Sequence, residues 1–319
     1  MDRIAVLIPC FNEELSIGKV IDDVHAFLPE ATVYVYDNNS TDKTAEIALS
    51  KGAVVRREYQ QGKGNVVRRM FREIDAESYL MVDGDNTYPL EEGRAMVDHI
   101  LSGEADMVVG DRLSSTYYKE NKRPFHNFGN ALVKFFVNLL FGHKTKIQDI
   151  MTGFRAFSYA FVKTFPVISK GFEIETEMTI HALSNNLAVV NHVVNYRDRQ
   201  AGSSSKLNTF NDGQKVLRTI YRLYKFYRPK SFFYIFSAIL FALSVGFFIP
   251  VLLNFFQTHT VEKIPTVIVC GSVFVVSVLS FFTGIILSHF QYQKRLEFEM
   301  RLILADDSFK QKKKDDSLL

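Results

Sequence analysis

Two aspartates separated by one glycine, Asp83-Gly84-Asp85, are the side chains in this sequence with the clearest chemical potential. They follow the apolar run Tyr79–Val82, which predicts a strand that ends where the acids begin. Glycine lets the backbone turn and come close to a ligand, and two carboxylates can share one hard cation, of the kind that commonly faces phosphate. The alternative is a surface turn, because Asp and Gly are common turn residues.

Two more polar segments follow predicted strands. Pro9–Glu13 comes after the apolar residues Ile4–Ile8, and Asp37–Ser40 comes after Thr32–Tyr36. Strands alternating with helices predict an α/β domain with a mostly parallel sheet covered on both faces, whose ligands bind at the carboxyl ends of the strands. We therefore expect these segments to meet Asp83–Asn86 at one sheet edge, with Asp37 placed to bind a ribose hydroxyl. The expected strands are residues 4–8, 32–36, 54–55, 78–82 and 107–110, and the expected helices are 15–27, one ending at 49, 61–74 and 90–101.

Several other classes of protein are disfavoured. The first turn lacks the G-x-G-x-x-G fingerprint of dinucleotide-binding folds, and Gly62-Lys63-Gly64 is not a Walker A loop. A net charge of +3 is too small to indicate a nucleic-acid partner. Cys10 and Cys270 lie far apart in segments of opposite character, so no disulfide framework is expected.

The C-terminal part of the chain contains two long apolar runs. Residues 231–256 and 264–290 carry no charged side chain, and each exceeds the roughly 20 residues that a helix needs to cross a bilayer. Two buried core helices would need a larger protein around them. We therefore expect a two-span membrane hairpin, with a bilayer as partner and without a preceding signal peptide.

Basic residues outside the hairpin predict its orientation. By the positive-inside rule, both flanks and hence both ends of the chain are expected on the cytoplasmic side of the membrane. The expected domains are a cytoplasmic catalytic domain (1–214), a juxtamembrane amphipathic helix (215–230), the two spans, and a solvated cytoplasmic tail (291–319). Membrane-surface binding by the tail and subunit contacts in a homo-oligomer stay open.

The polar motifs resemble a known family. Ile8–Glu14, Asp37–Asp42 and Asp83–Asp85 closely resemble the family 2 glycosyltransferases, which have a nucleotide-sugar-binding fold termed GT-A. Thr152–Arg155 and Arg199-x-x-Gly202-x-x-Ser205-Lys206-Leu207 are similar to the polyprenyl-phosphate subgroup, typified by dolichyl-phosphate mannose synthases and bacterial relatives with a two-helix membrane anchor. The resemblance covers nearly the whole chain, and the order and spacing of the motifs make it specific.

The resemblance implies a role for each matching residue. The base and ribose would be held by Pro9, Phe11, Glu13 and Asp37, with Asn12 and Asn39 in the same nucleotide-sugar site. Mg²⁺ or Mn²⁺ and the donor diphosphate would be bound by Asp83 and Asp85, with Gly84 giving backbone access. The sugar-phosphate and acceptor-phosphate region would be lined by Arg112, Lys170, Arg199, Ser205 and Lys206, with Arg123 as a further acceptor-phosphate candidate. The catalytic set would be Asp83, Asp85, Arg199 and Lys206.

The implied reaction is inverting transfer from a nucleotide sugar, with a UDP-sugar favoured, to undecaprenyl phosphate for cell-envelope glycan assembly. A phosphate acceptor is already anionic near neutral pH, so a strong general base is less necessary. Glu173 and Glu177 are expected to be structural, and Glu175 is the reserve base. The mannose synthases have a glutamine two residues after the acidic pair, whereas Asn86 and Thr87 follow here, which leaves the third metal ligand and the sugar unassigned.

Three alternative functions would each require different sequence features. A processive polysaccharide synthase would carry a Q-x-x-R-W motif, but the chain contains no tryptophan. A glycosyltransferase with a non-phosphate lipid or glycan acceptor stays open, although such an acceptor would demand a clear base. An inactive membrane scaffold would not need Asp37, Asp83 and Asp85.

Overall fold

The computed structural model describes residues 1–115, 134–139, 141, 146–171, 173–195, 221, 224–225 and 228–316. Arg123, Arg199, Ser205 and Lys206 lie outside this part of the chain, as does most of the expected juxtamembrane helix 215–230. The chain divides into two compact units, one formed by Met1–Val216 with Phe298–Leu319 and one by Leu217–Glu297.

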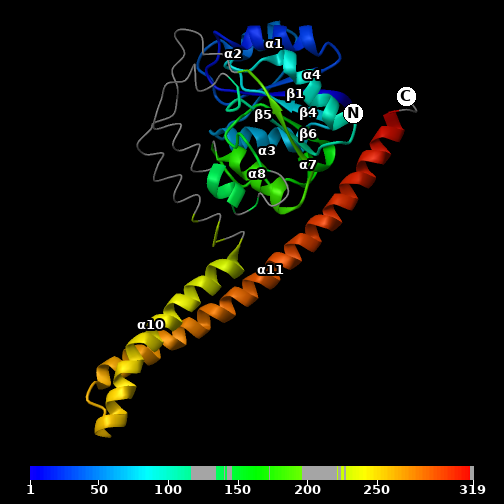
Figure 1. Ribbon diagram of the computed structural model, residues 1–319. Helices are drawn as coiled ribbons and strands as arrows, with labels where there is room; N and C mark the ends of the chain where they lie inside the picture. The colour runs from blue at the N-terminus through cyan, green and yellow to red at the C-terminus, as the bar shows by residue number, and fades with distance from the viewer. Residues whose placement is uncertain are drawn as a thin grey trace. The chain divides into compact units, whose positions relative to one another are not determined.

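The first unit is built on a seven-stranded sheet (Figure 1). The strands are β1 (Asp2–Cys10), β2 (Thr32–Asp37), β3 (Val54–Arg57), β4 (Ala76–Met81), β5 (Met107–Asp111), β6 (Arg155–Ser158) and β7 (Val189–Val193), in the spatial order β3-β2-β1-β4-β6-β5-β7. Neighbouring strands are parallel except where β6 pairs with β4 and with β5. The expected mostly parallel sheet is therefore confirmed, and β6 adds an antiparallel strand that was not expected.

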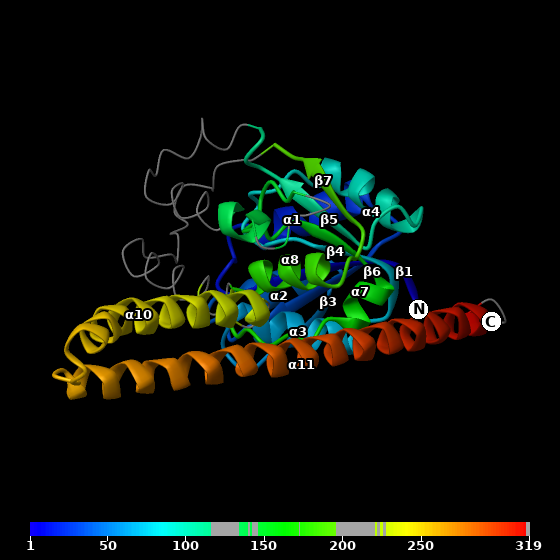
Figure 2. The same cartoon turned by 60° about the horizontal axis from the view of Figure 1, so that its bottom comes forward.

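Helices cover both faces of this sheet. One face carries α1 (Ile17–Phe27), α2 (Thr44–Ser50) and α4 (Gly93–Leu101), which follows a 3₁₀ turn (Leu90–Glu92). The other carries α3 (Lys63–Glu73), α7 (Tyr159–Thr164) and α8 (Ile174–Ser184), as Figures 1 and 2 show. Alternate residues of β1 point to opposite faces, so Ile4, Val6 and Ile8 pack in the core formed with Ile21 and Val24 of α1. This packing fixes the end of β1, from which the first polar segment continues.

The last part of α11 (Ile264–Asp316) belongs to the first unit and packs on the α/β domain. Phe298 lies edge-on to His181 with 5.3 Å between ring centroids, and Phe309 lies at 5.3 Å from Tyr159. Lys312 adds an ion pair, with its Nζ 2.5 Å from an Asp75 oxygen. Residues 298–316 therefore form a docked segment where a solvated tail was expected.

His181 gives the stability of this unit a pH dependence. Burial among the rings of Phe161, Phe165 and Phe298 lowers the pKa of His181 to about 4, whereas an unfolded histidine titrates near 6.5. Between these values the unfolded state binds more protons. The contribution of His181 to the free energy of unfolding therefore has its full value above about pH 6.5. It falls by roughly 3 kcal/mol as the pH approaches 4.

We expect His181→Phe to remove this component of the pH dependence. The measurement is the free energy of unfolding of the full chain in detergent at about pH 7.5 and about pH 5. His25→Gln, a change at an exposed histidine of α1, is the matched control and should leave the dependence as in the original protein. A dependence that survives in His181→Phe would contradict the assignment.

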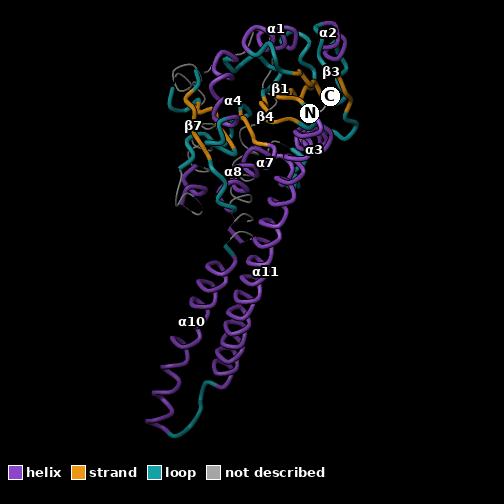
Figure 3. Tube along the Cα trace, turned by 90° about the vertical axis from the view of Figure 1, so that its right-hand side faces the viewer, coloured by secondary structure: helices purple, strands orange, loops and turns teal. Residues whose placement is uncertain are grey.

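The second unit is a helical hairpin formed by α10 (Pro229–Thr258) and the first part of α11, which lie side by side (Figures 1 and 3). Both helices are long and apolar enough to cross a membrane, and only 11% and 17% of their most apolar windows are buried. Ser237 and Ser277 donate their hydroxyls to each other's carbonyl oxygens at 2.9 Å, and Ser244 donates to the Cys270 carbonyl. Small polar residues of this kind allow helices to approach closely in a bilayer. Two candidate spans are thus present, and their membrane orientation stays a prediction.

Candidate active site

Three asparagines in the left-handed backbone region mark the carboxyl ends of adjacent strands. Asn12, Asn39 and Asn86 follow β1, β2 and β4 with φ of 54°, 65° and 58°, a conformation that asparagine adopts more readily than most residues. Because β1 lies between β2 and β4, the three turns share one edge of the sheet. The structure therefore brings the three predicted segments together.

Hydrogen bonds join the first two turns. The Asn12 side-chain oxygen accepts from the Thr41 backbone N at 2.8 Å, and the Ser40 hydroxyl accepts from the Asn12 backbone N at 2.9 Å. The Glu13 backbone N donates to the Thr44 hydroxyl at 2.8 Å. Asn12 therefore shapes the edge of the site by bonding to backbone, while Pro9 and Phe11 beside it are half-buried.

The end of β2 is held in the same way. Asp37 is 5% exposed, and both its carboxylate oxygens accept from the Ser40 backbone N at 3.2 Å. Asn38, which sequence reasoning did not single out, donates to the carbonyls of Glu58 and Gln60 and accepts from the Gly62 backbone N at 2.7 Å. Asn39 donates to the Tyr59 carbonyl at 2.9 Å. The asparagines thus fix the loop after β3 against the predicted ribose site.

The acidic pair lies against β1 and the start of α1. A methyl group at Gly84 would come within 2.8 Å of the Cys10 sulfur, and the Gly84 carbonyl accepts from the Ser16 hydroxyl at 2.7 Å. Asp85 is buried and accepts from the Thr87 hydroxyl at 2.7 Å. Close packing is thus one reason for glycine at this position, in addition to the expected backbone access for a ligand.

Lys63 is the main site residue that the sequence reasoning missed. Its Nζ lies 2.5 Å from Asp83 Oδ1 and 2.7 Å from Glu175 Oε1, so one buried ammonium joins α3, the end of β4 and α8. Burial alone would lower the pKa of Lys63, but the carboxylates of Asp83 and Glu175 outweigh it and raise the pKa. Lys63 therefore keeps a positive charge beside the predicted diphosphate site. The sequence feature that could have indicated Lys63 is its position between two glycines at the start of a predicted helix.

Gly62 and Gly64, on either side of Lys63, allow the loop that contains Ser169 and Lys170 to pack closely against the start of α3. Methyl groups at Gly62 and Gly64 would lie 2.2 and 2.1 Å from the carbonyl oxygens of Lys170 and Ser169. Glu177 accepts from the Ser169 backbone N at 2.9 Å, which gives it a structural contact of the kind expected. The exposed Lys170 side chain has no hydrogen bond or ion pair among the described residues, and its role toward the sugar-phosphate stays a prediction.

Arg112 has a protein partner. Its guanidinium donates to both carboxylate oxygens of Asp149, at 2.7 and 3.2 Å, and lies over the Tyr88 ring. Such a forked contact is among the stronger hydrogen-bonding arrangements in proteins. In this structure Arg112 holds the segment before Thr152, and its contact with a phosphate stays a prediction.

Gly153 lies directly against Asp83. A methyl group at Gly153 would be 2.4 Å from Asp83 Oδ2, and the Gly153 backbone N donates to the Tyr88 hydroxyl at 3.0 Å. Arg155, fully buried, holds this segment by donating to the carbonyls of Ile150 and Thr152. The Thr152–Arg155 motif therefore positions the first aspartate of the acidic pair.

We expect Gly153→Ala to lower activity about 100-fold, because a displacement of about 1 Å at a reacting group can cost that much. The carboxylate is the flexible end of a side chain, so it can shift and the fold should persist. The measurement is kcat/KM for nucleotide-sugar turnover together with the melting temperature. Gly246→Ala, in α10 with no atom within 4 Å of the added methyl group, is the control. Full activity in Gly153→Ala would show that Asp83 is not held by this contact.

Asp83 and Asp85 fit a divalent cation by donor chemistry. Mg²⁺ is usually bound by one or two carboxylates together with substrate phosphates and waters. The described residues contain no group of three or more His, Cys, Asp or Glu side chains that could hold an ion. We predict that the two aspartates share such a cation with the donor diphosphate and water.

Comparisons with known proteins agree with this architecture. A profile described as Glycosyl transferase family 2 matches residues 5–165. Glycosyltransferase AglJ of Haloferax volcanii is 31% identical over 93% of this chain and 98% of that protein. The dolichyl-phosphate hexose transferase of the same organism is 27% identical over 70% of this chain and 94% of that protein.

A solved structure shows the same fold. Glucosyl-3-phosphoglycerate synthase from Mycobacterium tuberculosis, crystallised with Mn²⁺ and uridine-diphosphate-glucose, superposes with a TM-score of 0.51 and 20% identity. The match covers 68% of this chain and 76% of that one, and it shows the GT-A fold. The chain belongs to glycosyl transferase family 2.

Proposed function

We propose that this glycosyltransferase moves a sugar from a nucleoside diphosphate sugar, with a UDP-sugar favoured, to a polyprenyl phosphate such as undecaprenyl phosphate. The observation that carries the proposal is the cluster of Lys63, Asp83 and Asp85 at the sheet edge that also holds Asp37. A cation and two metal-binding acids suit a diphosphate, and Asp37 suits a ribose. The relative named dolichyl-phosphate hexose transferase supports a lipid phosphate as acceptor.

The membrane hairpin supports the same acceptor. Two apolar helices would hold the enzyme at the bilayer in which a polyprenyl chain is dissolved. The basic flanks favour a cytoplasmic position for the catalytic domain and the C-terminal segment. Nucleotide sugar and lipid phosphate would then both be available to the enzyme.

In the proposed reaction, an acceptor phosphate oxygen attacks the anomeric carbon as the bond to the diphosphate oxygen breaks on the opposite face. Configuration at that carbon is inverted, and the nucleoside diphosphate leaves with the electron pair. Asp83 and Asp85 would hold Mg²⁺ or Mn²⁺, which when bound neutralises the leaving diphosphate. Lys63 keeps a fixed positive charge beside Asp83. We propose Lys170, Arg123, Arg199, Ser205 and Lys206 for the phosphate-bearing groups, with forked contacts from the arginines.

A phosphate acceptor does not need Glu175 as a base. A phosphate is already ionised near neutral pH and needs no proton removed before it attacks. Glu175 is buried and its Oε1 is paired with Lys63, so part of its basicity is offset by that ammonium. An acceptor that brings its own charge does not require this carboxylate as a base.

A second candidate function has one observation in its favour. Glu175 Oε2 is buried without a hydrogen-bond partner among the described residues. Burial raises the pKa of Glu175, and the Asp83 charge adds to this against the effect of Lys63. A carboxyl with a raised pKa suits general base catalysis, so transfer to a hydroxyl of a lipid or glycan is the alternative.

The chemical nature of the labelled product distinguishes transfer to a polyprenyl phosphate from transfer to a hydroxyl. Membranes containing the enzyme are incubated with a panel of radiolabelled nucleotide sugars and undecaprenyl phosphate. Label in a mild-acid-labile lipid supports the proposal, whereas label only in polymer or in a neutral glycolipid supports the alternative. In the proposed reaction Glu175→Gln lowers turnover by less than about 10-fold, while loss of a true general base costs about 10²–10⁴-fold. An inactive scaffold would transfer no label.

A further inference from the structure

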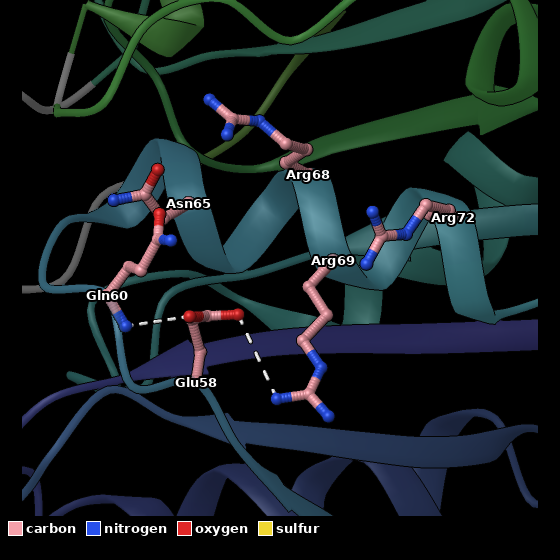
Figure 4. Close-up of a pocket in the computed structure, with 6 residues that line it drawn as sticks. All are labelled: Glu58, Gln60, Asn65, Arg68, Arg69 and Arg72. Carbon is pink, nitrogen blue, oxygen red and sulfur yellow. Dashed lines mark hydrogen bonds and ion pairs between the residues drawn. The ribbon is translucent and has the colours of Figure 1, made fainter.

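A hollow of about 130 Å³ lies beside α3, and neither aspartate of the acidic pair lines it. Figure 4 shows its lining residues. Three arginines of α3 line it together with residues of the loop after β3. The lining residues are Glu58, Gln60, Asn65, Arg68, Arg69 and Arg72. A water molecule's share of liquid volume is roughly 30 Å³, so the hollow has room for a phosphate group and a few attached polar atoms.

The three arginines differ in their hydrogen-bond and ion-pair partners. Arg69 is paired with Glu73 at 2.7 Å and with Glu58 at 3.8 Å. Among the described residues, Arg68 donates only its Nε, to the Val167 carbonyl at 3.2 Å, and Arg72 has no hydrogen bond or ion pair. Because Arg68 and Arg72 are four residues apart, they share one helix face, where like charges repel. An anion between them would offset that repulsion.

Asn65 adds a second, independent requirement. It is 6% exposed, and its Oδ1 has no hydrogen-bond partner in the described part of the chain. Its Nδ2 donates to the Gln61 carbonyl at 3.1 Å. This bond identifies the nitrogen end of the amide, so the oxygen is the atom without a partner. Buried acceptors are normally satisfied. Because this oxygen has almost no exposed surface, a donor on a ligand in the hollow would reach it after a small shift of the amide, while the anion of the ligand faces the arginines.

We propose that this hollow, the α3 anion site, binds a phosphate ester that carries a neighbouring hydroxyl or ammonium donor. Guanidinium groups match phosphate oxygens in planar, forked geometry, and the donor satisfies Asn65 Oδ1. The ligand is a phospholipid headgroup or a soluble phosphate ester with the same chemistry. The site shares no residue with the predicted donor-binding set, although the Glu58–Gln60 loop that lines it is held by Asn38 beside Asp37.

The test uses the full chain in detergent at constant ionic strength, because exposed charges are screened by salt. Isothermal titration with glycerol 3-phosphate and with inorganic phosphate measures soluble ligands. Native mass spectrometry after addition of phosphatidylglycerol, which has headgroup hydroxyls, or phosphatidylcholine, which has no headgroup hydrogen-bond donor, measures lipids. The variants are Arg68→Gln/Arg72→Gln and Asn65→Ala. Arg94→Gln/Lys51→Gln is the control, because it removes the same charge from exposed ion pairs elsewhere.

We expect glycerol 3-phosphate to bind more tightly than inorganic phosphate, and phosphatidylglycerol to be retained over phosphatidylcholine. The double arginine variant should bind at least about 10-fold more weakly, and Asn65→Ala should lose the preference for the ester while still binding phosphate. Retention of the lipid without binding of the soluble ester identifies a headgroup site, and the converse identifies a soluble ligand. The proposal is overturned if no probe binds, if the control weakens binding equally, or if the double variant, folded by circular dichroism, binds as the original does.

Discussion

Replacing Asp85 with asparagine is expected to lower metal-stimulated release of nucleoside diphosphate by about 10³-fold, because a catalytic cation contributes several kcal/mol of charge stabilisation. Asparagine keeps the shape of the side chain and the oxygen that accepts from Thr87, so the change removes mainly the charge. Asp85→Ala should give the same loss of activity with a larger loss of stability. The measurement is diphosphate release with added Mg²⁺ or Mn²⁺ and after chelation.

Asp98 provides the matched control for this prediction. It is an acid of α4 paired with Arg94 at the surface, and Asp98→Asn should leave the response to metal unchanged. Chelation should abolish release in the original protein and in the control alike. Release that is indifferent to chelation, or to Asp85→Asn, would remove the metal from the proposed reaction.

Replacing Lys63 with methionine is expected to lower both stability and activity. The ammonium sits between Asp83 and the buried Glu175, and breaking a buried ion pair by removing one partner typically costs about 3–5 kcal/mol. Activity should fall as well, because the cation beside the predicted diphosphate site is lost. Chemical denaturation measures the first effect and turnover of the nucleotide sugar measures the second. Lys51→Met, at an exposed pair with Asp22, is the control and should cost less than about 1 kcal/mol.

A double variant separates the two effects. In Lys63→Met/Glu175→Gln the buried carboxylate is neutral, so much of the lost stability should return while activity stays low. The coupling energy between the two sites should exceed about 1 kcal/mol, as expected for residues in direct contact. If the double variant recovers activity together with stability, Lys63 serves the fold alone. If the two changes are additive, the pair does not interact as the structure indicates.

Local pattern was sufficient to predict the sheet edge of the site. Each of the segments Pro9–Glu13, Asp37–Ser40 and Asp83–Asn86 directly follows an apolar strand, and parallel strands present their carboxyl ends together. The mostly parallel sheet also followed from strand–helix alternation, whereas β6 and β7, which lie after an irregular stretch, were not expected. Roles that depend on a bound ligand stay predictions, as do those of Arg123, Arg199, Ser205 and Lys206 outside the described chain.

Contacts between distant segments could not be read from the sequence. Lys63 and Glu175 are separated by 112 positions, and nothing near Lys63 distinguishes a buried counter-ion from a surface lysine. Gly153 was visible as part of a motif, but its contact with Asp83 needs the fold. Leu296–Leu304 has the amphipathic pattern of a surface helix, and the aromatic face that receives residues 298–316 is assembled from α7 and α8.

The docked segment has a consequence for how the protein is made. Residues 298–316 complete the same compact unit as residues 1–216, yet the ribosome adds them only after both apolar helices. At about 5–20 residues per second, several seconds separate the two parts of that unit during synthesis. Until then the side chains that Phe298 and Phe309 cover, His181 and Tyr159, lack these partners. Assembly of the catalytic unit is therefore finished only after the hairpin has been translated, which ties completion of the enzyme to delivery of its apolar helices.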